Sequence, residues 1–459
     1  MLTRRRFLYH GCAASAATMS GGSVLLQLAG ARRAAAQPAG DYRALVCILL
    51  AGGNDSFNML VPDDSESYAG YAALRTDLAL PRDSLLPLPG SDALGRRYGL
   101  HPGMPGLKQL FERGEAAFVN NVGTLLAPVD FEAIGGGSWP LPLGLFSHAD
   151  QIEQWQTAVS DARIAEGWGG RLADLFPESN NANGIAMNIS LSGNNVFQGG
   201  ASIAPYAVTT DDAGAVNLAG YNDGTASGDF TRAVVDQLLA APQDALLRRA
   251  YRDSLAGAIE AQQFFSAALA DAPPLATPFA GDPFSLALRQ IARIVAIRET
   301  LGASRQTFFI TVGGWDHHDD VLENQAEMLP MIDGGLAAFR DALAELGMLD
   351  RVTTFTTSDF GRTLTSNGKG SDHGWGGHHI VMGGAVNGGS FYGEYPDIYP
   401  GNPLDVGRGS FVPTLSVDEY FAELALWFGV APGDLATVLP NIGAFYSPSS
   451  GAAPVGFIA

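Results

Sequence analysis

Three apolar runs, widely separated along the chain, each end in a polar turn that carries an aspartate. The runs are residues 42–50, 307–312 and 352–357, and the aspartates that follow them are Asp55, Asp316 and Asp359. Short apolar runs that stop at such turns are typical of strands buried on both faces of a parallel sheet. Because ligands bind outside the carboxyl ends of parallel strands, we expect the three aspartates to meet at one edge of the sheet.

Helical patterns lie between these strands. Apolar residues recur with helical spacing in residues 283–300 and 324–347, and a capping box at residues 416–419 begins a helix that reaches Trp427. A further strand at residues 115–120 leads into a long loop rich in glycine and proline. The alternation predicts an α/β fold, a three-layer sandwich whose mostly parallel central sheet is covered by helices on both faces.

The stretch 180–282 has a different character. It is rich in Asn and Gly at first, and then rich in Ala and helical over residues 229–269. We interpret it as an inserted cap within a domain that spans residues 37–459. With 46% hydrophobic residues, the chain can bury one large core with a subsidiary cap, or two domains.

The N-terminus resembles a twin-arginine (Tat) export signal. Arg4-Arg5-Arg6-Phe7-Leu8 precedes a weakly apolar stretch that ends near Ala36, where we expect cleavage. The alternative is a frayed helix with accidental arginines. The signal peptide, residues 1–36, predicts a periplasmic or secreted protein that the Tat translocase exports already folded. Cys12 lies in a poor context for lipidation, so we expect no stable membrane anchor.

Charge and cysteine content exclude several classes of protein. Five of the 27 basic residues lie in residues 1–36, which leaves 22 against 47 acidic residues and a net charge of −25. This balance argues against nucleic acid as a partner. Only Cys47 remains after cleavage, so no intramolecular disulfide can form and the core must provide the stability.

Histidines gather near two of the strand-end aspartates. Seven histidines remain after cleavage, and five of them fall in the segment that contains Asp316 and Asp359: His317, His318, His373, His378 and His379. Alone, each such aspartate is most often a turn or cap residue, and the adjacent His317 and His318 fit an ordinary polar surface. Together, carboxylates and imidazoles suit zinc, or manganese or iron, so the pattern predicts a divalent metal site of one or two ions.

Ser147 and His148 stand where the long loop meets a helical segment. The simpler interpretation makes Ser147 the N-cap of that helix. The functional one makes it a nucleophile, because backbone N–H groups at a helix N-terminus favour negative charge and a bound divalent cation would lower the pKa of the hydroxyl.

Several segments together resemble a known family. They are, in order, residues 50–58, 147–148, 167–171, 314–318, 358–363, 372–375 and 381–384. They resemble domain-of-unknown-function family fifteen-hundred-and-one over nearly the whole mature chain. That family looks like a branch of the alkaline phosphatase superfamily, so the resemblance implies a parallel α/β sandwich with a two-metal site that acts on phosphate or sulfate esters.

The resemblance also implies roles for individual residues. Asp55 would hold one metal ion, Ser147 would be the nucleophile between the two ions, and Asp316, His318 and His373 would hold the second. Asp359 would be a metal ligand, as the acid of an Asp-His pair, but Phe360 stands where the histidine of that pair is expected. A second departure is that Asp316 and His318 are two residues apart instead of the usual four.

Other side chains complete the predicted site. His148, His317 or His378 would complete the set of metal ligands that Phe360 leaves incomplete. Arg171 or Arg362 would bind ester oxygens through a bidentate guanidinium. The alternative for either arginine is a surface ion pair, which is the commoner role of this residue. We therefore predict an exported, metal-dependent hydrolase of phosphate or related sulfate esters, acting on a small-molecule or polymer substrate. The alternative, which Phe360 favours, is a non-catalytic exported protein that keeps the fold and acts in binding or envelope assembly.

Overall fold

The computed structural model describes residues 42–180, 184–216, 218, 220–221 and 224–459. The predicted export signal, residues 1–36, lies outside the described residues. Within the described part of the chain, no helix combines the length and the apolar character needed to cross a bilayer.

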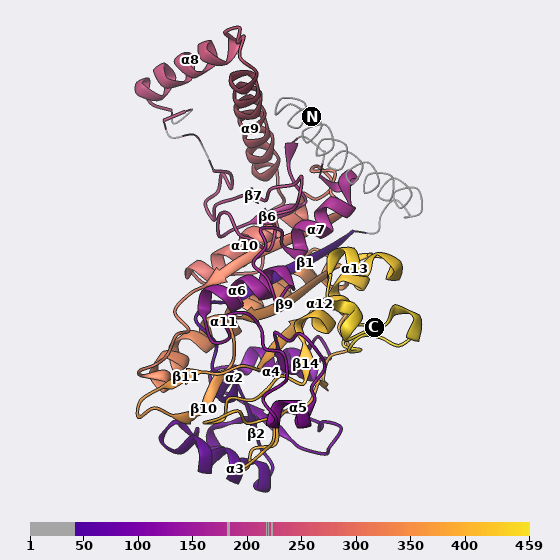
Figure 1. The fold of residues 1–459 in the computed structure, drawn as a ribbon. Coiled ribbons are helices and arrows are strands. Elements are labelled where there is room, and N and C mark those ends of the chain that lie inside the picture. Colours follow the sequence, from indigo (N-terminus) through magenta and orange to yellow (C-terminus); the bar gives the residue numbers. More distant parts are fainter. Residues whose placement is uncertain (1–41, 181–183, 217, 219, 222–223) are drawn as a thin grey trace, which may run out of the picture.

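A nine-stranded sheet runs through the middle of the molecule (Figure 1). Its spatial order is β13 (Phe391–Tyr392), β5 (Ala116–Gly123), β12 (Gly377–Met382), β9 (Val352–Ser358), β1 (Arg43–Leu50), β8 (Arg305–Val312), β6 (Asn188–Ser190) and β7 (Tyr206–Ala207), with β14 (Leu415–Ser416) beside β5. In this sheet β12 runs antiparallel to both of its neighbours, and the other pairs of neighbouring strands are parallel. The predicted mostly parallel sheet is therefore confirmed.

Strand β1 lies at the centre of the sheet because its side chains are apolar on both faces. Val46 and Ile48 belong to one hydrophobic core, whereas Leu45 and Leu49 belong to a second core on the opposite face. All four are almost fully buried, and burying a side chain of this size stabilises the fold by about 1.5–3 kcal/mol. The register of β1 is set by β8 on one side and β9 on the other, with Leu50 opposite Val312 and Ser358.

Helices cover both faces of the sheet. The first core is covered by α4 (Pro105–Glu112), α10 (Pro283–Ala296) and α11 (Val321–Glu345). The second is covered by α6 (His148–Thr157), α7 (Trp168–Leu175), α12 (Val417–Phe428) and α13 (Leu435–Val438). The predicted three-layer α/β sandwich is thus observed, and the predicted capping box is present, with Ser416 and Glu419 each accepting from the other's backbone N–H.

Smaller elements surround the carboxyl ends of the strands. They are α2 (Ser56–Met59), α3 (Ser65–Arg75), α5 (Phe131–Gly135), a three-stranded sheet of β2 (Leu60–Pro62), β3 (Leu86–Pro87) and β4 (Tyr98–Leu100), and the hairpin β10 (Arg362–Ser366) and β11 (Ser371–His373). The hairpin follows directly on β9, so its residues lie close to the ends of β1 and β8.

Residues 180–282 contribute to two different parts of the molecule. Strands β6 and β7 belong to the central sheet, whereas α8 (Ala226–Ala240) and α9 (Leu246–Ala270) extend away from it at the top of Figure 1. None of the side chains that form the cluster described below comes from this segment. Its role as a cap remains a prediction.

Candidate metal centre

Asp316 lies at the centre of a cluster of ionisable side chains at the edge of the sheet. The loop after β8 carries it, and its side chain is 47% exposed. Arg362, which begins β10, is fully buried and donates to one carboxylate oxygen of Asp316. The same guanidinium donates to the carbonyl oxygens of Gly53 and Ser371 at 2.9 Å. Arg362 therefore holds Asp316 in position.

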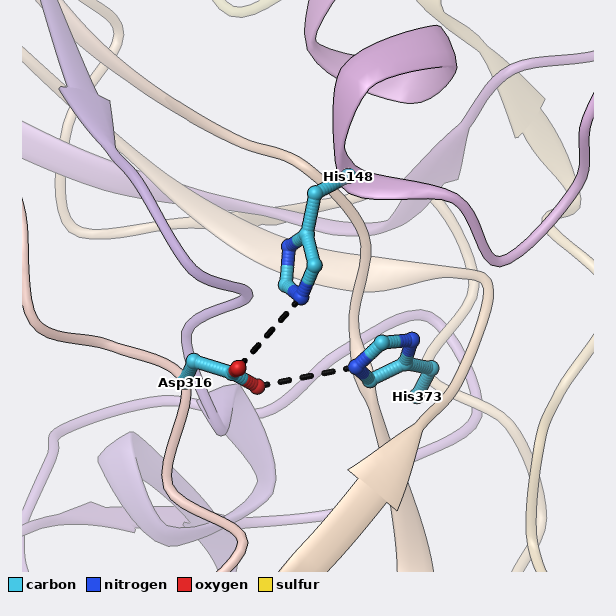
Figure 2. A group of neighbouring side chains, drawn as sticks. All are labelled: His148, Asp316 and His373. Atoms are coloured by element: carbon cyan, nitrogen blue, oxygen red, sulfur yellow. Dashed lines mark ion pairs between the residues drawn. The ribbon is translucent and has the colours of Figure 1, made fainter.

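Three histidines direct their Nε2 atoms toward Asp316. His148 begins α6 and lies 3.5 Å from one carboxylate oxygen, and His373 ends β11 and lies 3.5 Å from the other (Figure 2). His318 lies 3.1 Å from the second oxygen, and its Nε2 is 3.0 Å from that of His373. Side chains from three distant segments therefore meet at one point.

Each of these histidines is held by an oxygen atom at its other ring nitrogen. The Nδ1 atom of His148 lies 2.6 Å from a carboxylate oxygen of Asp359, and that of His318 lies 3.1 Å from Asp372. The Nδ1 atom of His373 lies 2.8 Å from the carbonyl oxygen of Phe146. A carbonyl can only accept, so Nδ1 of His373 carries the proton, and the carboxylates favour the same tautomer in the other two. The Nε2 atoms are then free to act as ligands.

The Nε2 atoms of His318 and His373 need a cation near them. In the tautomers described above, both nitrogen atoms carry lone pairs. The two nitrogen atoms are 3.0 Å apart, so their lone pairs repel each other. A proton or a metal ion removes this repulsion, and the nearby carboxylate of Asp316 adds a further donor. The donor atoms of His148, Asp316 and His373 all lie within 4.8 Å of one another, which makes them the one such group in the described part of the chain.

The spacing of the donor atoms fits a divalent metal ion. Neighbouring ligands of a tetrahedral zinc ion lie about 3.3 Å apart when each bond is 2.0–2.1 Å long. The separations measured from Asp316 to the three histidines are 3.1–3.5 Å. The nitrogen and carboxylate donors suit zinc, and manganese and iron accept the same set.

Arginines and burial tune the charges in this cluster. Burial alone would raise the pKa of Asp316, but the hydrogen bond and charge of Arg362 hold it below its usual value. Burial, together with the charge of Arg362, lowers the pKa of His373, which favours its neutral, ligating form. Despite partial burial, hydrogen bonds from Asn367, Arg408 and His318 lower the pKa of Asp372 to about 2, so it stays ionised.

Phe360 packs against two of the candidate ligand histidines. Its ring centroid is 4.8 Å from that of His148 and 4.5 Å from that of His373, and the side chain is almost fully buried. The position where the family resemblance calls for another histidine is therefore filled by an apolar wall. This wall limits how the two imidazole rings can turn.

The structure gives Asp359 a different role from the predicted one. It is fully buried, one of its oxygens accepts from the N–H of Gly52 at 3.0 Å, and the other contacts His148. It is not one of the donor atoms that converge on Asp316. Asp359 is instead a positioning residue, which holds His148 in the orientation that the cluster needs.

The structure places the predicted metal ligand Asp55 in a buried ion pair, and its role as a ligand stays a prediction. Asp55 is fully buried, and one of its carboxylate oxygens accepts from both Arg75 and the hydroxyl of Ser371, the latter at 2.7 Å. The guanidinium of Arg75 supplies the positive charge that a metal ion would otherwise provide. Asp55 therefore stabilises the fold next to the site.

Three other predicted contacts lie outside the cluster. His378 is buried, stacks on Tyr395 at 4.3 Å and accepts from the N–H of Asn121. Arg171 donates to backbone carbonyl oxygens, including that of Val438 at 2.7 Å, and so holds α7 in place. His317 is buried beside Trp315, at 6.0 Å between ring centroids, and burial lowers its pKa.

Two further predictions have structural outcomes. The hydroxyl of Ser147 accepts from the N–H of Asp150 at 3.5 Å and caps α6, as the simpler interpretation expects. Its role as a nucleophile stays a prediction. Arg362 contacts Asp316 and backbone carbonyls from a fully buried position, and its predicted role in binding ester oxygens stays a prediction.

Asp372 has a role that the sequence pattern did not indicate. This residue holds Nδ1 of His318 and is itself held by Arg408 and by Asn367, which donates at 3.0 Å. Its position directly before His373 was a usable signal, since carboxylates commonly orient ligand histidines. The sequence gives no signal for the contact between the carbonyl of Phe146 and His373, because any residue at position 146 offers the same backbone oxygen.

Residues 42–406 match a protein family described as "Protein of unknown function (DUF1501)". The chain belongs to this family. A comparison of this DUF1501 protein with curated proteins finds no match.

Solved structures show limited similarity to this DUF1501 protein. The crystal structure of Ps i-CgsB is 9% identical with a TM-score of 0.36, covering 88% of this chain and 77% of that one. The lipoteichoic acid synthase LtaP from Listeria monocytogenes is 9% identical with a TM-score of 0.34, covering 87% and 75%. A mutant of the alkaline phosphatase PafA is 13% identical with a TM-score of 0.29, covering 71% and 64%.

The buried Asp55–Arg75 pair makes a stability prediction. Replacing Arg75 with Met leaves the carboxylate of Asp55 buried without its cation, and breaking such a pair costs about 3–5 kcal/mol. We expect this decrease in the free energy of unfolding, measured by urea denaturation. Adding Asp55→Asn should recover part of it. Arg232→Met removes a matched but exposed ion pair with Asp229 and should cost at most about 1 kcal/mol; equal costs for the two arginines would contradict the assignment.

Asp359→Asn tests whether Asp359 positions His148. The amide keeps the shape of the side chain but weakens the hold on Nδ1 of His148, and the loss of such a partner typically lowers metal affinity about 10–100-fold. Zinc affinity is measured by competition with a chromophoric chelator. The matched control is Asp319→Asn, an exposed aspartate in the same loop as Asp316. Unchanged zinc affinity in Asp359→Asn would show that His148 does not bind the metal.

Proposed function

We propose that this protein is an exported, metal-dependent hydrolase of phosphate or related sulfate esters. The observation that carries the proposal is the convergence of three anchored histidines on Asp316, with each Nε2 atom 3.1–3.5 Å from one of its two carboxylate oxygens. A cluster built in this way at the carboxyl ends of parallel strands is suited to binding a divalent cation next to a substrate.

The residues of the cluster either hold the metal ion or keep its ligands in position. His148, Asp316 and His373 would hold the ion, with His318 as a fourth ligand, and zinc fits this donor set best. When bound, such an ion polarises an ester oxygen and stabilises the charge that develops on it. Arg362 and Asp359 keep the ligands in position. A single ion is favoured, because Arg75 neutralises Asp55 and Phe360 fills the space of another ligand.

Ser147 is the nucleophile in this proposal. It directly precedes His148, and it stands at the N-terminus of α6, where backbone N–H groups favour negative charge on its oxygen. Its hydroxyl would form a bond to the phosphorus or sulfur atom as the alcohol leaves, and water would then release the ester formed on Ser147.

Export by the Tat translocase belongs to the same proposal. The arginine motif at residues 4–8 and the weakly apolar stretch behind it support a periplasmic or secreted location. The Tat pathway carries folded proteins. A site assembled from segments as far apart as His148 and Asp359, separated by 211 residues, suits folding and metal loading before export.

A second candidate is a non-catalytic exported protein that binds a metal ion and acts in binding or envelope assembly. Phe360 favours it, because an apolar ring occupies the position of an expected ligand. The two candidates differ in one measurable property: only the hydrolase turns over esters when loaded with metal.

The metal assignment is tested with protein purified from its native compartment. Elemental analysis should find a stoichiometric divalent ion, and purified protein should hydrolyse at least one member of a panel of phosphomonoesters, phosphodiesters and sulfate esters. Asp316→Asn and His373→Ala should each lose the metal and the activity, because each removes a donor atom. Asp319→Asn should keep both. Metal retained by both site variants would overturn the assignment, and metal without turnover would favour the non-catalytic candidate.

Ser147→Gly tests the nucleophile separately from the helix cap. Glycine is nearly as good an N-cap as serine, so the substitution removes the hydroxyl at a cost of only a few tenths of a kcal/mol in stability. We expect turnover to fall by several orders of magnitude while the metal content is unchanged. Unchanged turnover would show that Ser147 serves only as the cap of α6.

A further inference from the structure

A cavity of about 430 Å³ opens next to the cluster. Its size lies within the range of pockets that hold small molecules. The segment before α6 forms one wall, the hairpin β10–β11 with Trp375 forms a second, and a loop near residue 407 forms the third. The side chains that line the cavity include Trp139, Leu141, Phe146, His373, Trp375 and Val406.

The walls of this cavity are apolar because its two tryptophans use their polar atoms elsewhere. The indole N–H of Trp139 donates to the carbonyl of Pro128 at 3.2 Å, and that of Trp375 donates to the carbonyl of Thr124 at 2.9 Å. The two ring centroids are 5.7 Å apart. What the tryptophans offer to the cavity is therefore aromatic surface.

Further apolar side chains around the cavity are exposed. Leu141 is 58% exposed, Val406 47% and Phe146 36%. Exposed aliphatic and aromatic side chains around a hollow gain free energy when an apolar group covers them. The charged groups there already serve other partners: Arg408 pairs with Asp372, and Asp372 holds His318.

The cavity and the metal centre share a wall. His373 lines the cavity, and its Nε2 belongs to the cluster around Asp316. The carbonyl of Phe146, another lining residue, holds Nδ1 of the same histidine. A molecule that occupies the cavity therefore reaches the donor atoms at the His373 side.

We propose that the substrate is an ester of an apolar alcohol, with an aryl or alkyl group that lies between Leu141, Phe146 and the two tryptophans. This inference rests on the proposed ester hydrolysis and adds the substrate class. The ester group lies at the His373 side, and the apolar alcohol is the leaving group. Sugar phosphates and polyanions are poor fits, because Leu141, Phe146, Val406 and the two tryptophans make most of the cavity wall apolar.

A series of n-alkyl phosphates, and the matching n-alkyl sulfates, tests the substrate class on the metal-loaded protein. Their leaving alcohols are nearly equal in basicity, so chain length changes mainly the apolar area that is buried. We expect kcat/KM to rise about fourfold per methylene from ethyl to octyl until the cavity is full. Glycerol phosphate should be a poor substrate. Equal kcat/KM across the series would overturn the inference while leaving ester hydrolysis intact.

Leu141→Asp and its matched control locate the effect. Leu141→Asp places a charge on the cavity wall, so the ratio of kcat/KM between octyl and ethyl esters should fall at least tenfold, and Val406→Asp should act in the same direction. Leu247→Asp changes a more exposed leucine on α9, 82% exposed, and should leave the ratio unchanged. An unchanged ratio in both cavity variants would overturn the inference.

Binding of 1-naphthol, measured by isothermal titration calorimetry, separates the cavity from the chemistry. We expect wild-type protein to bind this apolar alcohol and Leu141→Asp to bind it at least tenfold more weakly. Failure of the wild type to bind it would overturn the inference. If 1-naphthol binds through Leu141 but no ester is cleaved, the proposed hydrolase fails and the preference of the cavity for apolar groups stands.

Discussion

The buried guanidinium of Arg362 connects the segments from which the site is built. It donates to the backbone after β1 at Gly53, to the backbone of β11 at Ser371, and to the carboxylate of Asp316 after β8. These segments come from distant parts of the chain, and a buried arginine is stable only when its donors are satisfied. Arg362 therefore requires the strand ends to lie where they do, and Asp316 takes its position from this requirement.

The cations beside two strand-end aspartates give them different roles. Asp55 faces Arg75 from α3 in a fully buried ion pair, which already places a positive charge beside it. Asp316 also contacts an arginine, but it remains half exposed and has three imidazoles around it. One carboxylate thus stabilises the fold and the other is available for chemistry, although the sequence presents both as an acid after a strand.

Rigidity is the common property of the candidate ligands. Asp359, Asp372 and the carbonyl of Phe146 each hold one histidine through Nδ1, and Phe360 packs against two of the rings. Ligands that are already oriented lose little conformational freedom when an ion binds. The loop that contains Phe146 also lines the apolar cavity. The contact between Phe146 and His373 therefore helps to fix both a candidate metal ligand and the cavity surface.

The sequence by itself determined the strands, the helices and the edge of the sheet at which the polar residues gather. Apolar runs such as residues 42–50 and 307–312 can be buried only in a covered sheet, and parallel strands bring their carboxyl ends together. It also indicated Asp316, His318 and His373. Only the tertiary structure decided which acids face the cluster, because that depends on partners that are distant in the sequence. Arg75 forms an ion pair with Asp55, and Asp359 contacts His148, which lies 211 residues away in the sequence. The spacing of residues along the chain predicts local structure. Which cation lies next to a buried carboxylate depends on how distant segments pack together.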